Sequence, residues 1–242
     1  MIPIEKLLFD IDQKLNRNAN LKGQYIPDET KIQVLNIAQD KLVLKKVGIN
    51  NNYQLGVDSF TKRYQDLQVL MVQPEKQAVT KVTGDLLNSY SMPIASLTNK
   101  MVIPMQAYVT ATKGKCIDSI LDITVFVRHE DIKQYLNSPY YTPKFEYQET
   151  IGVISGGLIY VYGDSDNTFT IDNLYLSYLR YPVQMDIAGY IHLDGTSSAT
   201  VDCELEEYLE NELTELAVEE LADSTGNNEQ SQLSRTRTKE AE

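Results

Sequence analysis

The sequence predicts an α+β fold, with a helical layer drawn from both ends of the chain and a central antiparallel β-domain. Apolar residues recur at helical spacing near the N-terminus and again near the C-terminus. Between them, β-branched and aromatic runs alternate with turn residues, as in strands. Helices, then strands, then a helix is an order typical of α+β proteins. The predicted parts are a helical region at 1–72 that packs with a helix at 202–223, a β-domain at 73–201, and a polar tail at 224–242 that is disordered or ordered by a partner.

Three helices are expected before the β-domain. The first, at 4–19, carries five apolar residues on one face: Ile4, Leu7, Leu8, Ile11 and Leu15. The second runs from Asp28, a residue suited to the N-cap, to about Val47. The third is predicted at 59–71. Amphipathic helices of this kind are expected to pack on one another.

The β-domain is expected to be a meander of antiparallel strands. Gly156 and Gly157 predict a two-residue hairpin turn, because glycine tolerates the positive φ angles that such a turn needs. A short helix at 131–136 interrupts the strands and ends before Pro139. The expected strands are 78–82, 101–104, 106–110, 117–128, 151–155, 158–162, 168–171 and 174–181.

The last predicted helix is strongly acidic. Ten Asp and Glu residues and no Lys or Arg lie between residues 202 and 223, whereas the whole chain has a net charge of −12. The acidic face has three interpretations: a solvated surface, a subunit contact, or the lining of a channel that repels passing DNA. The candidate residues for a contact or lining are Glu206, Glu207, Glu210 and Glu212. This charge distribution disfavours nucleic-acid binding through a basic patch.

The sequence contains no P-loop, dinucleotide-binding, GxSxG or HExxH motif. His129 stands beside two acids, which suggests either an acid–base cluster or the first-turn acids of a helix. His192 is interpreted as a strand residue. The run 164–167 has the alternating oxygen ligands that begin a calcium loop, but it lacks the later glycine and glutamate, so we interpret it as a turn. We assign no catalytic, metal-binding or cofactor-binding residue.

Sixteen tyrosines and no tryptophan are unusual. Tyrosine combines a large apolar ring with a polar end, which suits both half-buried strands and subunit contacts. The candidates for packing or interface contacts are Tyr140, Tyr141, Tyr160, Tyr162, Tyr178 and Tyr181.

Several features indicate a soluble protein made in the cytoplasm. Cys116 and Cys203 are far apart in the sequence and form neither a disulfide framework nor a zinc motif. The N-terminus carries charges where a signal peptide has its apolar core. No apolar run is long enough to suggest a membrane span.

Three segments together resemble the head-to-tail connector (adaptor or ring) proteins of tailed bacteriophages, especially crAss-like phages of gut Bacteroidales. The first is IPDETKIQVLNIAQDKL in the N-terminal helices. The second is DIKQYLNSPYYTPKFEY with the following LIYVYG and LYLSYLRYPVQMDI. The third is CELEEYLENELTELAVEELADSTGN with the polar tail. The resemblance spans most of the chain through loose patterns.

The resemblance implies a virion subunit rather than an enzyme. Such a subunit forms a homo-oligomeric ring, usually a dodecamer, that docks beneath the portal protein and binds the next tail or connector protein. Genomic DNA would pass through the ring without specific binding. An alternative is a β-rich tail fibre, spike or host-surface glycan-binding virion protein, because tyrosines on strands can stack on sugars. A hydrolase that uses His129 with nearby carboxylates is a third hypothesis.

Overall fold

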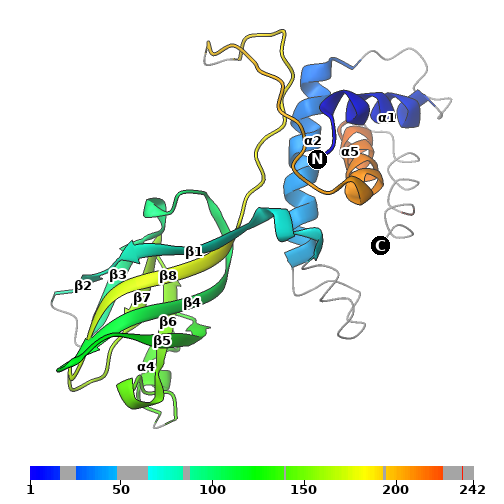
Figure 1. The fold of residues 1–242 in the computed structure, drawn as a ribbon. Coiled ribbons are helices and arrows are strands. Elements are labelled where there is room, and N and C mark those ends of the chain that lie inside the picture. Colours follow the sequence, from blue (N-terminus) through cyan, green and yellow to red (C-terminus); the bar gives the residue numbers. More distant parts are fainter. Residues whose placement is uncertain are drawn as a thin grey trace. The chain divides into compact units, whose positions relative to one another are not determined.

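The structure is a computed structural model that describes residues 1–16, 26–47, 65–83, 88–138, 140–192, 195–225 and 236. The chain divides into two compact units. One, here called the helical unit, joins Met1–Leu70 to Pro182–Glu242; the other, the sheet unit, is Met71–Tyr181. Helices and strands are largely segregated between the two, and the predicted α+β class is confirmed (Figure 1).

The helical unit is built from α1 (Ile4–Asn16), α2 (Asp28–Val47) and α5 (Glu210–Thr225). The C-terminal α5 packs against both N-terminal helices (Figure 1). Two short 3₁₀ helices, η2 (Gln68–Leu70) and η5 (Glu207–Leu209), belong to the same unit. Its buried apolar side chains include Ile4, Leu7, Ile11, Leu35, Leu42, Leu70, Leu209, Leu213, Ala217 and Leu221.

The two ends of the helical unit are tied together before its helices begin. The backbone of Ile2 exchanges hydrogen bonds of 2.9 and 3.0 Å with Cys203. The carboxylate of Asp202 accepts a hydrogen bond of 3.0 Å from the backbone N–H of Ile4, at the start of α1. An acidic acceptor there satisfies an N–H group that has no partner within the helix.

The third helix, predicted at 59–71, is wrong at its C-terminal end. Residues 59–64 lie outside the described residues, and the chain after them forms only a short helical turn and η2. Met71 starts a strand instead of ending a helix, because it pairs with Leu179 across the sheet. The first helix, predicted to residue 19, is described to Asn16. Apart from 224, 225 and 236, the predicted tail also lies outside the described residues.

The sheet unit is one curled sheet of eight strands in the order β1-β8-β4-β5-β6-β7-β3-β2 (Figure 1). Only Val79 separates β1 from β2, so one stretch of chain supplies both edges of the sheet. The sheet therefore curls around its own core. The strands are β1 (Met71–Ala78), β2 (Thr80–Lys81), β3 (Ser89–Pro93), β4 (Met101–Lys113), β5 (Cys116–Val127), β6 (Glu149–Ser155), β7 (Leu158–Tyr162) and β8 (Thr170–Arg180).

The sheet encloses the main apolar core of this unit. Alternate residues of β8 point inward, so that Leu174, Leu176 and Tyr178 are fully buried. They pack with Phe169, just before β8, and with inward residues of the other strands, among them Met92, Val109, Leu121, Ile159 and Val161. A second, smaller core joins the outside of β6 and β7 to α4 (Ile132–Leu136) through Val127, Ile132, Ile151, Val153 and Tyr162.

The sheet is mixed rather than wholly antiparallel as predicted. β5 and β6 run parallel, and every other pair is antiparallel. A parallel pair needs a long crossover, which the segment 128–148 supplies with α4 and η4 (Phe145–Tyr147). The predicted hairpin between β6 and β7 is confirmed: Gly156 and Gly157 have φ angles of +59° and +77°.

The predicted β-domain at 73–201 is too long at its C-terminal end. The sheet unit stops at Tyr181, and residues 182–201 belong to the helical unit. The amide of Asn36 on α2 holds both backbone groups of Met185: Oδ1 accepts from its N–H at 2.7 Å, and Nδ2 donates to its carbonyl at 3.0 Å. Strand-like patterning in 182–201 did not reveal which unit the segment joins.

Candidate functional site

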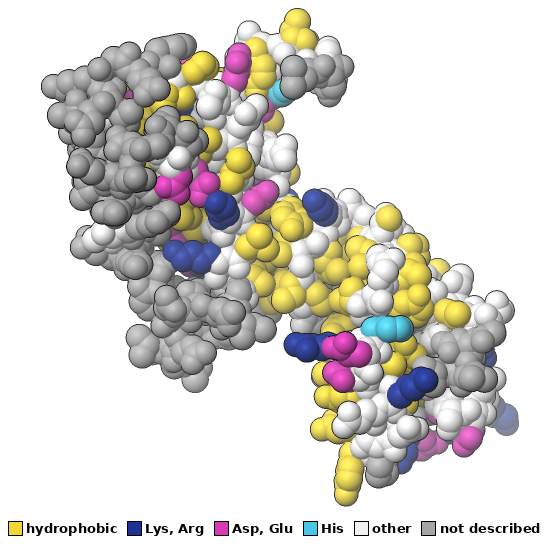
Figure 2. Space-filling view, turned by 180° about the vertical axis from the view of Figure 1, so that it is seen from behind, with side chains coloured by type: hydrophobic (Ala, Val, Ile, Leu, Met, Phe, Trp, Pro, Cys, Tyr) yellow, Lys and Arg dark blue, Asp and Glu magenta, His cyan; other side chains and the backbone are white. Residues whose placement is uncertain are grey.

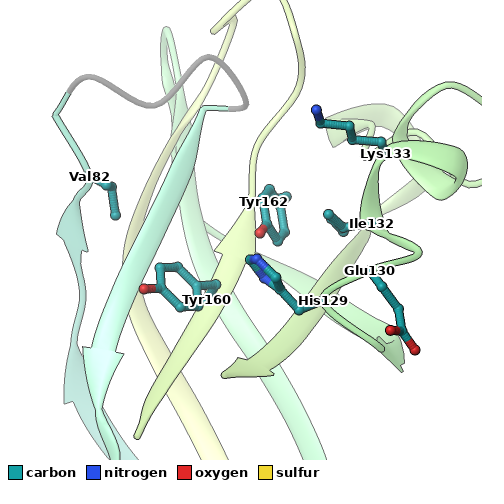
Figure 3. Close-up of a pocket in the computed structure, with 7 residues that line it drawn as sticks. All are labelled: Val82, His129, Glu130, Ile132, Lys133, Tyr160 and Tyr162. Atoms are coloured by element: carbon teal, nitrogen blue, oxygen red, sulfur yellow. The ribbon is translucent and has the colours of Figure 1, made fainter. Parts of the chain in front are cut away.

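The described surface of the sheet unit has a hollow of about 470 Å³ beside α4 (Figure 3). β7 contributes two tyrosines to it, the turn after β5 contributes a histidine and a glutamate, and α4 contributes an isoleucine and a lysine. The lining residues are Val82, His129, Glu130, Ile132, Lys133, Tyr160 and Tyr162.

Local packing fixes this arrangement. β5 ends at Val127, and the chain turns at once, with the N–H of Asp131 donating to the carbonyl of Arg128 at 3.0 Å. Ile132 at the start of α4 is 3% exposed and belongs to the small core against β6. The buried isoleucine therefore anchors α4, and this anchor places His129 and Lys133 at the hollow.

The polar groups of the hollow are mostly hydrogen-bond donors. In Figure 3 the His129 ring extends toward the two tyrosines, whereas the carboxylate of Glu130 points away from them. Glu130 instead lies 3.8 Å from Arg128, and both of these side chains are largely exposed. The hollow therefore presents an imidazole, an ammonium group and phenol rings. Such a site favours an anionic group carried on an apolar or aromatic body.

The hollow does not assemble the parts of a hydrolase. No hydrogen bond joins His129 to Glu130 or Asp131 among the described residues, and Asp131 precedes α4 as its N-cap residue. No Ser, Thr or Cys is among the described lining residues, and the hydroxyl groups of the lining are the phenols of Tyr160 and Tyr162. Among the described residues, no third group orients His129 as a base.

The other histidine lies in a polar cluster that the sequence analysis missed. His192 Nε2 is 3.0 Å from Asp186 Oδ2, and the hydroxyl of Tyr190 donates to the other oxygen of that carboxylate. The hydrogen bond to Asp186 raises the pKa of Tyr190 to about 12. These side-chain contacts lie on one arm of a narrow hairpin. Backbone bridges between Asp186 and Val201 and between Ile191 and Ser197 join its two arms. The only sequence signal for this cluster was the close spacing of the three polar residues at 186, 190 and 192.

The six candidate tyrosines fall into two groups. Tyr162 and Tyr178 are only 3% and 0% exposed, so the interface assignment is wrong for both. They occupy buried strand positions and pack within their own chain. The others reach the surface to different degrees. Tyr160 lines the hollow, Tyr181 lies under the ammonium group of Lys100, and Tyr140 and Tyr141 are 86% and 53% exposed.

The acidic helix is largely neutralised by lysines of the same chain. Figure 2 shows acidic and basic side chains side by side on the visible face of the helical unit. Glu212, whose side chain is 6% exposed, pairs with Lys46 and therefore does not line a channel as predicted. Further pairs between α5 and the N-terminal helices include Lys6–Glu210 at 2.6 Å, Lys14–Glu215 at 3.1 Å and Lys41–Glu220.

The two remaining candidate acids differ from these. Glu206 is half-buried, Glu207 is exposed, and neither makes an ion pair within the described part of the chain. Glu207 contributes only a weak electrostatic effect at Lys6. Burial tends to raise the pKa of Glu210, but its hydrogen bonds with Lys6 and Asp10, together with the charges of Lys6 and Lys14, outweigh burial and lower it. Glu210 is thus paired within its own chain, whereas Glu206 and Glu207 remain available for a contact with another molecule.

The run 164–167 forms a turn, as interpreted from the sequence. The carboxylate of Asp164 accepts hydrogen bonds from the backbone N–H of Thr168 at 2.9 Å and from its hydroxyl at 2.5 Å. Asn167 adopts a φ angle of +53°, which asparagine tolerates better than most residues. Among the described residues, no three His, Cys, Asp or Glu side chains gather to hold a metal ion.

Comparison with known proteins gives no relative: no protein-family model matches the chain, and no curated protein matches it. None of the helices in the described ranges is long and apolar enough to cross a membrane.

Proposed function

We propose that this chain is a non-enzymatic structural subunit of a phage head-to-tail connector. In this proposal, copies assemble into a homo-oligomeric ring, a dodecamer in the usual case, that docks beneath the portal protein in the virion. The ring extends the DNA channel and offers a platform to the next tail or connector protein. The resemblance of three sequence segments to this class of protein motivates the proposal.

One structural observation supports it most: each unit separately exposes large apolar side chains. On the helical unit, Phe9 is 60% exposed, and Ile37 and Leu44 of α2 are each 48% exposed. On the sheet unit, Ile117 and Ile120 of β5 are 70% and 54% exposed. Figure 2 shows hydrophobic side chains gathered over the sheet unit. A ring requires two different faces on each subunit, because its contacts are heterologous.

The charge of the chain fits a channel protein that does not hold DNA. The net charge is −12, and the lysines of α1 and α2 that pair with α5 are already neutralised. Phosphate binding needs clustered, available cations. DNA would therefore pass the ring without adhering to it.

Native mass spectrometry of the full chain, alone and mixed with the portal protein, tests this function. We expect a ring of about a dozen copies on the portal, as closed cyclic symmetry allows. A stable trimer that ignores the portal would overturn the proposal and favour a fibre or spike component.

A glycan-binding virion protein is the second candidate, and one observation favours it. Tyr108 and Tyr175 stack with ring centroids 4.8 Å apart and planes 8° apart. They lie on the outer face of the sheet, because their neighbours Val109, Leu174 and Leu176 are buried. Aromatic rings on a sheet face can stack on sugars. Specific glycan binding that Tyr175→Ala abolishes, without binding to the portal, would favour this candidate.

A further inference from the structure

One carboxylate, that of Glu130, belongs to the described lining of the hollow beside α4, and it forms no ion pair with Lys133 or His129. Lys133 and His129 face the hollow, and no salt bridge within the described chain reaches either of them there. The carboxylate of Glu130 is turned away from the tyrosines (Figure 3). Tyr160 and Tyr162 supply an aromatic wall, while Ile132 adds an apolar one. A matching ligand has a carboxylate next to an aromatic or aliphatic group.

The helical unit presents a segment with that chemistry. Glu206 precedes the short helix η5, which contains Glu207 and leads into α5. Tyr208 of η5 is 57% exposed, although its hydroxyl is bound to Asp66. The backbone of Glu206 is extended, and the short helix η5 begins with the next residue. Four glutamates of α5 have lysine partners in the same chain, but these two have none among the described residues.

From this complementarity we infer that the hollow of one copy receives the Glu206–Glu207–Tyr208 segment of a neighbouring copy. The inference rests on the proposed function, since it needs copies that associate. It identifies the two faces of the contact: the hollow of the sheet unit and the start of α5 on the helical unit. Because every copy carries both faces, the contact is head-to-tail and repeats around a ring.

The charges in this contact determine orientation more than affinity. Lys133 and Glu207 are both exposed in the single chain, so their attraction is screened by water and salt. Complementary charges at such a rim steer association and reject wrong partners, whereas buried apolar contacts supply most of the affinity. The exposed ring of Tyr208 and the tyrosine wall of the hollow are suited to the second role.

Charge reversal on the full chain tests the inference. In the proposed contact, Lys133→Glu places two carboxylates against each other, and Glu207→Lys places two ammonium groups against each other. Each variant alone should therefore associate at least about tenfold more weakly than wild type. The double variant K133E/E207K should recover association. Lys115→Glu is the matched control, because this exposed lysine lies on the same unit but does not line the hollow.

Mixing the two single variants separates a contact between copies from one within a chain. In an alternating assembly, the native and the reversed charge pairs are both complementary, so the mixture should assemble as well as wild type. Native mass spectrometry with one variant isotopically labelled would show alternating masses. Recovery in the double variant without recovery in the mixture would place the contact within one chain and overturn the inference.

The remaining outcomes separate the inference from the proposed function. If wild type forms rings on the portal and both reversals leave them unchanged, the inference is overturned and the proposed function stands. If wild type never forms rings, alone or with the portal, both are overturned. Circular dichroism of each variant checks that the fold is intact.

Discussion

Lys46 and Glu212 form a buried ion pair between α2 and α5, with Nζ 2.8 Å from Oε2 and side chains that are 12% and 6% exposed. The same ammonium group lies 3.1 Å from Asp66, whose side chain is 2% exposed. Tyr208 donates a hydrogen bond of 2.7 Å to the other oxygen of Asp66. One lysine thus joins α2, α5 and the segment that leads into the sheet unit.

Lys46→Met should destabilise the helical unit by about 3–5 kcal/mol, because it leaves two buried carboxylates without their cation. The measurement is urea unfolding followed by the circular dichroism of the helices. Lys41→Met is the matched control: Lys41 also pairs with a glutamate of α5, but its side chain is 53% exposed. The control should cost at most about 1 kcal/mol. Equal losses in the two variants would contradict the structural role of the buried pair.

The pH dependence of the sheet unit should include a contribution from Glu75. Burial tends to raise its pKa, but hydrogen bonds from Thr98 and Tyr178 outweigh burial and hold the pKa below the ordinary 4.5. The folded state therefore binds this proton less tightly than the unfolded state. The resulting stabilisation is complete above the ordinary pKa and is lost as the pH falls through the lower, folded pKa.

Glu75→Gln removes this contribution and should flatten the acid side of the stability curve. The test is chemical unfolding of both proteins from neutral pH to below 4.5, the ordinary pKa of this carboxyl group. Wild type should lose more free energy of unfolding than the variant over that range. Parallel curves would show that Glu75 titrates with the same pKa in both states.

Much of the fold could be predicted from the sequence, since it follows from local patterns. The apolar spacing near the C-terminus and the Gly156-Gly157 turn led to α5 and to the β6–β7 hairpin. The start of that last helix was predicted wrongly: α5 begins at Glu210 rather than at 202, because Glu206 is extended and 207–209 form the 3₁₀ helix η5. The parallel pairing of β5 with β6 could not be predicted, because alternation along a strand does not identify its neighbours. Residues 182–201 were misassigned for the same reason: their attachment depends on Asn36, far away in the sequence.

The candidate site was less predictable than the fold. The acidic helix suggested free carboxylates, but Lys6, Lys14, Lys41 and Lys46 neutralise four of them from distant positions in the chain. Likewise, a tyrosine on a strand has the same sequence signal whether it points inward or outward. Only the pairing of the sheet shows that Tyr178 faces the core, whereas the next tyrosine toward the N-terminus, Tyr175, faces outward.

The difference between buried and exposed tyrosines should appear in stability. Tyr178→Phe removes a hydroxyl that donates to Glu75 at 3.1 Å and accepts from the N–H of Asn99 at 3.2 Å. We expect a loss of about 1–3 kcal/mol, because the N–H of Asn99 loses its acceptor and Glu75, which keeps its bonds from Thr98 and Gln77, loses one donor in a partly buried site. Tyr140→Phe, at a side chain that is 86% exposed, should change the free energy of unfolding by less than about 0.5 kcal/mol. Thermal or chemical unfolding measures both, and a neutral Tyr178→Phe would contradict the assignment.

The two cysteines should differ sharply in reactivity. Cys116 is exposed at the start of β5, whereas Cys203 is fully buried beside Ile2. Burial also raises the pKa of the Cys203 thiol, which disfavours the reactive thiolate. Brief treatment of the native protein with iodoacetamide should label Cys116 alone, as peptide mass spectrometry would show. Unfolding in urea should expose both thiols. Rapid labelling of Cys203 in the native protein would contradict its burial and its backbone pairing with Ile2.

Asn36 should control whether the segment 182–201 stays attached to the helical unit. Its amide is the side-chain group that bonds both the N–H and the carbonyl of Met185, while Met185 itself is 1% exposed. Asn36→Ala leaves these two backbone groups without their partner, which should cost about 1–3 kcal/mol.

Asn36→Asp is the informative comparison, because a carboxylate can still accept from the N–H but cannot donate to the carbonyl. Hydrogen exchange at Asp186 and Val201, whose amides bond each other's carbonyls, should therefore accelerate most in the alanine variant and less in the aspartate variant. Unchanged exchange in Asn36→Ala would mean that the buried side chain of Met185 alone secures the segment.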